Sequence, residues 1–182
     1  MTEIEAKLKV DSLQQIVEKL VELGAEFLAE QLQTDCYFDD AESTLKNSDK
    51  ALRLRRQVTD NTENVLLTYK GPKVKDNFKK RQEIEIEIKD ANSAEKLLLS
   101  LGYEKALVFE KKRRIWQVGD CVIALDELPL LGDFVEIEGP DDKRITDVQK
   151  SLGLTNLPHI RESYASLIEQ KLHTNEGRYE AG

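Results

Sequence analysis

Three copies of the tripeptide Glu-Ile-Glu constrain most strongly how this chain can fold. They lie at residues 3–5, 85–87 and 136–138. Each precedes an amphipathic helical pattern that ends in Leu-Gly, and these patterns cover residues 12–24, 92–102 and 141–153. Alternating charged and apolar residues are typical of a strand with two different faces. The repeated unit is therefore a two-faced strand followed by a helix with one apolar side to bury.

Period-two patterning elsewhere predicts about seven further strands, which makes about eight with the first. These strands are expected at Phe27–Asp39, Ala51–Val58, Val65–Gly71, Phe78–Lys89, Leu107–Val118, Cys121–Glu127 and Asp133–Glu138. Gly71 and Pro72 are interpreted as a turn that ends one of them. Residues 159–172 form a last amphipathic segment, and 173–182 are expected to be a flexible tail. Because no linker divides the chain, we predict a single domain over residues 1–172.

Sorting alternate residues of each strand onto two faces separates charged side chains from apolar ones. The charged face carries Glu3, Glu5, Lys7, Arg53, Arg55, Thr68, Lys70, Arg81, Glu83, Glu85, Glu87, Lys111, Arg113, Glu136 and Glu138. For any single strand, the simplest interpretation is a polar face turned to water. The helices, however, need the apolar faces, and the charges are segregated by type from strand to strand. If the sheet curls into a barrel beneath the helices, the charged side chains line its interior.

An interior lined with charges predicts the kind of ligand that it binds. An eight-stranded barrel has room for side chains or one small ligand. Inward Arg and Lys would bind a strongly anionic group, whereas paired carboxylates would hold a hard divalent cation such as Mg2+ or Mn2+. A phosphate compound together with a metal ion satisfies both sets of side chains.

Overall charge and composition argue against several classes of protein. A net charge of -8 and a pI near 5.0 disfavour a nucleic-acid partner. No apolar run approaches the length of a membrane helix, and the N-terminus lacks the features of a signal peptide. We therefore expect a cytoplasmic protein without a membrane partner, either a monomer or a homodimer. Cys36 and Cys121 have no metal-ligand spacing and are expected to be reduced and buried.

Several segments together resemble the CYTH domain, also called the triphosphate tunnel metalloenzyme family. They are Glu3-x-Glu5-x-Lys7, TDCYFDD, ALRLRR, LTYKGP, RQEIEIEI, FEKKRRIW and LDELPLLGDFVEIEG, in this order from Thr2 to about Ile168. The family contains class IV (CyaB-type) adenylyl cyclases, thiamine triphosphatases and inorganic triphosphatases. The resemblance implies an α+β fold: a closed antiparallel eight-stranded β-barrel, the triphosphate tunnel, with helices packed on the outside.

The resemblance also implies roles for individual residues. Ligands of Mg2+ or Mn2+ would be Glu3, Glu5, Asp126, Glu136 and Glu138. Phosphate oxygens would be bound by Lys7, Arg53, Arg55, Lys70, Arg81, Lys111 and Arg113. Candidate catalytic residues are Lys7, Lys70 and Glu85, whereas Glu87 at the strand end could be solvated. The segment FEKKRRIW also permits Lys112 and Arg114 to face inward, and we take Lys111 and Arg113 because Arg113 stands three residues before Trp116.

Three functions remain open from the sequence. The first is conversion of ATP to cyclic AMP and pyrophosphate. The segments LTYKGP and LPLLGDFVEIEG favour it, because they look closer to the class IV cyclases of the family. The second is hydrolysis of a terminal phosphate of tripolyphosphate, thiamine triphosphate or a nucleoside triphosphate. The third is binding of polyphosphate without turnover. The phosphate and metal residues are common to both enzymatic functions, so these motifs do not separate them.

Overall fold

The computed structural model describes residues 2–74 and 79–179, with side chains for 4–74 and 80–174. Within these residues the chain forms eight strands and five helices. The strands are β1 (Thr2–Val10), β2 (Glu26–Asp39), β3 (Ala51–Thr59), β4 (Thr62–Val74), β5 (Lys79–Ile88), β6 (Glu104–Val118), β7 (Cys121–Leu128) and β8 (Gly132–Glu138). The helices are α1 (Leu13–Glu22), α2 (Thr44–Asn47), α3 (Ala91–Ser100), α4 (Asp142–Ser151) and α5 (Tyr164–Tyr179).

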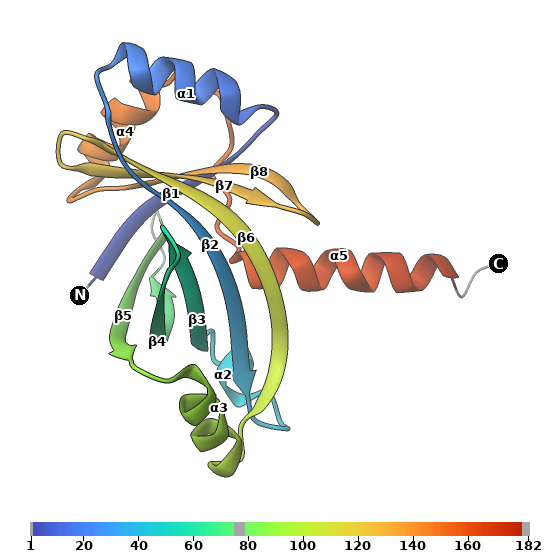
Figure 1. The fold of residues 1–182 in the computed structure, drawn as a ribbon. Helices are drawn as coiled ribbons and strands as arrows, with labels where there is room; N and C mark the ends of the chain where they lie inside the picture. Colours follow the sequence, from blue (N-terminus) through green and yellow to red (C-terminus); the bar gives the residue numbers. More distant parts are fainter. Residues whose placement is uncertain (1, 75–78, 180–182) are drawn as a thin grey trace.

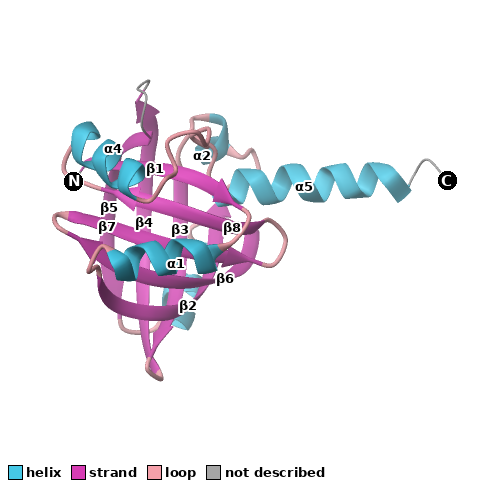
Figure 2. Cartoon of the chain, turned by 90° about the horizontal axis from the view of Figure 1, so that it is seen from above, coloured by secondary structure: helices cyan, strands magenta, loops and turns pink. Residues whose placement is uncertain are grey.

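The strands close into one antiparallel barrel in the order β1-β5-β4-β3-β2-β6-β7-β8. The first strand closes it, because β1 pairs with β5 near its start and with β8 along the rest of its length. Figures 1 and 2 show the curved strands with helices on the outside. The predicted fold class, an α+β fold around a closed eight-stranded barrel, is confirmed.

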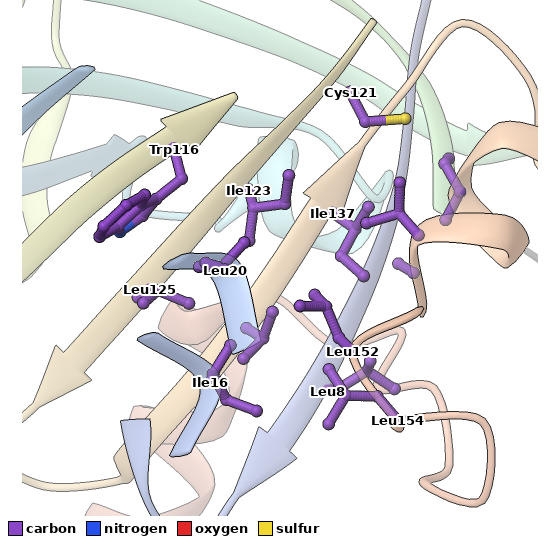
Figure 3. Close-up of a cluster of buried hydrophobic side chains, with 14 of the residues drawn as sticks. Leu8, Ile16, Leu20, Trp116, Cys121, Ile123, Leu125, Ile137, Leu152 and Leu154 are labelled. Atoms are coloured by element: carbon purple, nitrogen blue, oxygen red, sulfur yellow. The ribbon is translucent and has the colours of Figure 1, made fainter. Parts of the chain in front are cut away.

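The apolar faces of the strands point outward, and helices bury part of them, whereas Leu32, Ile84, Ile86 and Val108 are about half exposed. In the largest cluster, Leu20 of α1 and Leu152 at the end of α4 pack against Leu8, Ile123 and other residues of β1, β6, β7 and β8 (Figure 3). These four side chains are fully shielded from water. Since full burial of one such side chain contributes roughly 1.5–3 kcal/mol, this layer holds α1 and α4 firmly on the barrel.

Two smaller apolar clusters attach α3 and α5 to the barrel. Leu98 of α3 packs with Leu54 and Val65 at a second cluster near one end of the barrel. Tyr164 and Ile168 of α5 pack in a third cluster with Phe109, Leu128 and Phe134. Beyond this contact α5 projects away from the barrel (Figures 1 and 2). None of the helices that the structure describes is long and apolar enough to cross a membrane.

The helix ends agree with the sequence pattern. The Leu-Gly pairs that end the three helical patterns do so through glycines in the left-handed region, for example Gly24 (φ 68°) and Gly102 (φ 90°). A residue with a Cβ is strained in this conformation, whereas glycine is not. Ser12 precedes α1 without making a side-chain cap hydrogen bond. Cys36 is half-buried and Cys121 buried, and both are free thiols.

Several predicted strand ends differ from the structure by up to three residues, and two differences at segment ends concern an expected turn and an expected tail. The turn predicted at Gly71 and Pro72 is wrong, because β4 continues to Val74 through a β-bulge: Lys70 pairs with Glu83 and Lys73 with Arg81. The bulge accommodates Pro72, which cannot donate to a regular ladder. At the other end of the chain, α5 runs through the expected tail as far as Tyr179, because each further helical residue adds a backbone hydrogen bond. Residues 180–182, and Phe78 in an expected strand, lie outside the described residues.

We predict that Gly139→Ala, directly after β8, destabilises the fold. An added Cβ would lie 2.9 Å from Cys121 Sγ and 3.0 Å from Ile145 Cγ1, and such overpacking costs about 1–3 kcal/mol. The measurement is the free energy of unfolding in urea. Gly71→Ala is the control, because its Cβ would meet nothing closer than 3.4 Å. Equal losses in both variants would contradict this account of Gly139.

Candidate active site

The barrel interior contains a cavity of about 470 Å³ that is lined mainly by charged side chains. Every residue predicted to bind phosphate lines it: Lys7, Arg53, Arg55, Lys70, Arg81, Lys111 and Arg113. Four predicted carboxylates line it as well: Glu5, Glu85, Glu136 and Glu138. Of the other two, Asp126 lies behind the wall, and the side chain of Glu3 is outside the described residues. The alternation of the strands thus brings together residues that are up to 133 positions apart.

One wall of the cavity is built on β2 and β3 around Asp35, which no sequence argument assigned. Arg55 makes a two-bond ion pair with it, Nε to Oδ1 at 2.6 Å and Nη2 to Oδ2 at 2.8 Å. Arg53 Nη1 lies 3.9 Å from Asp35 Oδ2. Burial alone would raise the pKa of Asp35, but the two guanidinium groups outweigh it and hold that pKa below its usual range. Asp35 therefore stays ionised and orients both arginines.

A second wall joins β3, β4 and β5 through a chain of polar contacts. Arg53 donates to the Thr68 hydroxyl at 3.1 Å, and this hydroxyl donates to Glu85 at 2.8 Å. On the same strands, Lys70 forms an ion pair with Glu83. Thr68 is fully shielded from water, whereas the Glu85 side chain is 44% exposed. Glu85 is consequently anchored at one side and open to the cavity at the other.

The third wall, on β6, β7 and β8, is organised by Asp126. Its carboxylate is 0% exposed and accepts hydrogen bonds from Arg113 Nε at 2.6 Å, Lys111 Nζ at 3.1 Å and the Tyr164 hydroxyl at 2.8 Å. Burial opposes ionisation, but Arg113 and Lys111 keep the pKa of Asp126 low. Its predicted role as a metal ligand would require these cations to release it. Its place in the structure is that of a buried anchor for Arg113 and Lys111.

The inward register predicted for β6 is confirmed. Lys111 is 2% exposed, and burial together with the charge of Arg113 lowers the pKa of Lys111 to about 7. Lys112 instead pairs with Glu30 on the outside at 3.0 Å, with both side chains nearly half exposed. Arg114 likewise pairs with Glu127, at 3.4 Å. The cavity therefore receives the first and third residues of Lys111-Lys112-Arg113.

Carboxylates gather where β1 meets β8. Glu5 is the direct cross-strand partner of Glu138, and Lys7 is that of Glu136. Partial desolvation, together with the negative charges of Glu5 and Glu136, raises the pKa of Glu138. Like charges directly opposite each other destabilise a sheet. This edge of the cavity would therefore gain from a bound cation.

The carboxylate edge fits a hard divalent metal ion by its chemistry. Its donors are carboxylate oxygens, which Mg2+ and Mn2+ prefer. Among the side chains that the structure describes, no three His, Cys, Asp or Glu residues form a ready metal cage. The side chain of Glu3, which is also a predicted ligand, is not among them. Glu5, Glu136 and Glu138 are the described residues that could hold a metal ion.

Sequence reasoning missed residues that reach the cavity from outside the regular strand alternation. Tyr164, at the start of α5, packs in the third hydrophobic cluster and also lines the cavity. Lys46 of α2 also lines the cavity and forms an ion pair with Glu169 of α5 at 2.9 Å. Lys73 pairs with Asp49 at 2.6 Å in the same region. Helix starts, bulges and connecting segments have no period-two pattern, so face sorting could not find these residues.

Comparisons with known proteins agree with the barrel fold. The model of the CYTH domain family matches residues 1–164. A protein of Methanocaldococcus jannaschii, named "Putative adenylate cyclase MJ0240", is 32% identical over 176 residues, which cover 92% of this chain and 98% of that protein. Adenylate cyclase CyaB of Aeromonas hydrophila is 30% identical over 183 residues, with 95% and 92% covered.

Solved structures show the same fold. The PH1819 protein of Pyrococcus horikoshii OT3 has a TM-score of 0.80 at 32% identity, covering 93% of this chain and 99% of its own. HpAC1 of Hippeastrum, for which a dominant triphosphatase activity is described, has a TM-score of 0.74 at 20% identity, covering 92% and 95%. At that identity the likeness supports the fold alone. The family match over most of the length, together with the relatives at 30% and 32% identity, shows that this chain belongs to the CYTH domain family.

Proposed function

We propose that this protein is a metal-dependent enzyme that binds the triphosphate group of ATP in the barrel cavity and forms cyclic AMP and pyrophosphate. One observation carries the proposal: all seven Lys and Arg residues predicted to bind phosphate, from five strands, line a single cavity together with a carboxylate edge. Fixed cations of this kind bind phosphate oxygens, and Arg does so with two parallel hydrogen bonds. The two curated relatives carry adenylate cyclase names, which supports this choice of reaction.

The ion pairs of the cavity explain why a metal ion belongs to the proposal. Lys70 is paired with Glu83, Arg53 with Glu85, and Arg113 with Glu136. An entering triphosphate would compete for these cations, and the carboxylates that lose them would need positive partners. Mg2+ or Mn2+, when bound at the carboxylate edge, would neutralise negative charge and polarise phosphate oxygens. Glu5, Glu136 and Glu138 would hold it, with Glu3 as the further ligand that the family resemblance implies.

The side chains of the barrel supply positioning and charge, which are the main requirements of phosphoryl and nucleotidyl transfer. Asp35 holds Arg55 in place and Asp126 holds Arg113, so these guanidinium groups would orient the phosphate chain. Lys7 and Lys70 would neutralise charge that develops on its oxygens. The ribose 3'-oxygen bonds to the α-phosphorus, and the bond from that phosphorus to the pyrophosphate oxygen breaks. Glu85, open to the cavity, would accept the proton of the attacking hydroxyl.

A second candidate function is hydrolysis of a terminal phosphate, with water in place of the ribose hydroxyl. The same cations would bind tripolyphosphate, thiamine triphosphate or a nucleoside triphosphate. HpAC1, for which a dominant triphosphatase activity is described, has the same fold, so the fold is compatible with this reaction. A third candidate, binding of polyphosphate without turnover, requires only the cations. Because polyphosphate binding alone does not explain the carboxylates Glu5, Glu136 and Glu138, we rank this function below the two reactions.

We expect ATP, incubated with the protein and Mg2+ or Mn2+, to give cyclic AMP and pyrophosphate in equal amounts. Parallel incubations with tripolyphosphate and with thiamine triphosphate test hydrolysis through release of orthophosphate. Omitting the metal and adding a chelator should abolish turnover. Orthophosphate without cyclic AMP would replace the cyclase by a triphosphatase, and binding without any product would leave only the polyphosphate-binding function.

We predict that Glu136→Gln lowers turnover by about 100-fold or more, because it removes a proposed metal ligand while keeping the size of the side chain. The matched control is Glu87→Gln. It changes a glutamate in another copy of the Glu-Ile-Glu motif, but Glu87 is exposed and does not line the cavity. Circular dichroism should show both variants folded. Metal-dependent turnover retained in folded Glu136→Gln would show that Glu136 is not an essential ligand.

A further inference from the structure

Tyr164, the first residue of α5, contacts two of the lysines that line the cavity. The Nζ atom of Lys7 lies 4.0 Å from the centroid of the Tyr164 ring, and that of Lys111 lies 4.8 Å from it. Both distances are within the range of cation–π attraction, which is stronger when the groups are shielded from water. All three side chains are buried, at 2%, 2% and 6% exposure for Lys7, Lys111 and Tyr164. One aromatic ring thus contacts two of the cations assigned to phosphate.

The position of this ring is fixed by its surroundings. It packs edge-on against Phe134, with ring centroids 5.1 Å apart and an interplanar angle of 77°. Its hydroxyl donates to Asp126 at 2.8 Å. Ser163 Oγ accepts from Ser166 N at 3.1 Å and so caps the helix start that presents Tyr164. The ring is therefore held from the core side and by its own helix.

Lys7 is tied to the same segment at both its ends. Its backbone carbonyl accepts from Ile160 N at 2.8 Å, and its Nζ donates to the Glu162 carbonyl at 3.1 Å. The segment that leads into α5 thus holds the main chain and the ammonium group of Lys7. Docking of α5 and placement of Lys7 are parts of one arrangement.

An aromatic ring suits this place for an electrostatic reason. The local group contains three cations, Lys7, Lys111 and Arg113, but two carboxylates, Asp126 and Glu136, and Arg113 contacts both of these. A third carboxylate would neutralise the lysines and repel a triphosphate. Each lysine already has one carboxylate partner, Glu136 for Lys7 at 3.3 Å and Asp126 for Lys111 at 3.1 Å. The face of a ring attracts an ammonium group without carrying a formal charge, so it holds the lysines without adding negative charge beside them.

We propose that Tyr164 is a positioning residue for triphosphate binding: its ring holds the side chains of Lys7 and Lys111 toward the cavity without adding a negative charge beside them. The inference rests on the proposed function, because it assigns Tyr164 to the same phosphate site. It makes the C-terminal helix part of that site, although the strands alone supply the groups that contact phosphate.

The test compares Tyr164→Leu, Tyr164→Phe and Ile168→Ala in the full chain. Isothermal titration with tripolyphosphate in Mg2+ gives the Kd of each. Loss of the ring in Tyr164→Leu should raise Kd about ten-fold, and Tyr164→Phe, which keeps the ring, should stay within about three-fold of wild type. Ile168 is buried in the same cluster but does not line the cavity, so Ile168→Ala should lower thermal stability and leave Kd unchanged. In assays with a substrate that the protein converts to product, Tyr164→Leu should raise KM by a larger factor than it lowers kcat.

Each contrary result has a distinct meaning. An unchanged Kd in Tyr164→Leu overturns the inference alone, and so does an equal loss in Tyr164→Phe, because the hydroxyl bond to Asp126 would then be the cause. An equal loss in Ile168→Ala would assign the effect to stability and overturns it too. If Tyr164→Leu does not fold, Tyr164→Met replaces it, because Met fills irregular gaps. Wild-type protein that binds no tripolyphosphate overturns the proposed function, and the inference with it.

Discussion

Closure of the barrel is the constraint on which the rest of the structure depends. Because β1 pairs with both β5 and β8, the sheet has an inside and an outside, and every second side chain of each strand must be accommodated within. The outer face is largely apolar and is covered in part by α1, α3, α4 and the start of α5. The inner face is charged and largely shielded from water, where an uncompensated charge is costly. Every inward cation therefore needs a partner in the structure or in a ligand.

The partners that the structure provides fall into two kinds. Asp35 and Asp126 are almost completely buried, and they bind Arg55 and Arg113 in geometries that hold these cations in place. Glu83, Glu85 and Glu136 face the cavity, and in the proposed function their ion pairs would be exchanged for phosphate and metal. The first kind builds the wall and the second makes it responsive to a ligand. Tyr164 adds a third kind of partner, one that attracts a cation without a charge of its own.

Much of this arrangement could be predicted because strand alternation is a local property. The eight strands, the stops of three helices and the inward register of Arg53, Arg55 and Lys70 follow from period-two and Leu-Gly patterns. The register of Lys111 and Arg113, which alternation alone left open, was taken from the family resemblance. The turn expected at Gly71 and Pro72 failed for a tertiary reason: pairing with β5 continues across a bulge, so the strand extends beyond a local turn signal. The tail was likewise judged by composition, and α5 runs through most of it.

The sequence by itself determined which side chains face the barrel interior, since the two-residue period assigns every strand residue to one face. It also indicated the family, which the comparisons confirm. Only the tertiary structure decided which inward charges meet. It placed Asp126, which stays a predicted metal ligand, in contact with Arg113 and Lys111, and it brought Tyr164 against Lys7, 157 positions earlier in the chain. These contacts depend on barrel closure and on the docking of α5, and no local pattern encodes the distance between residues so far apart.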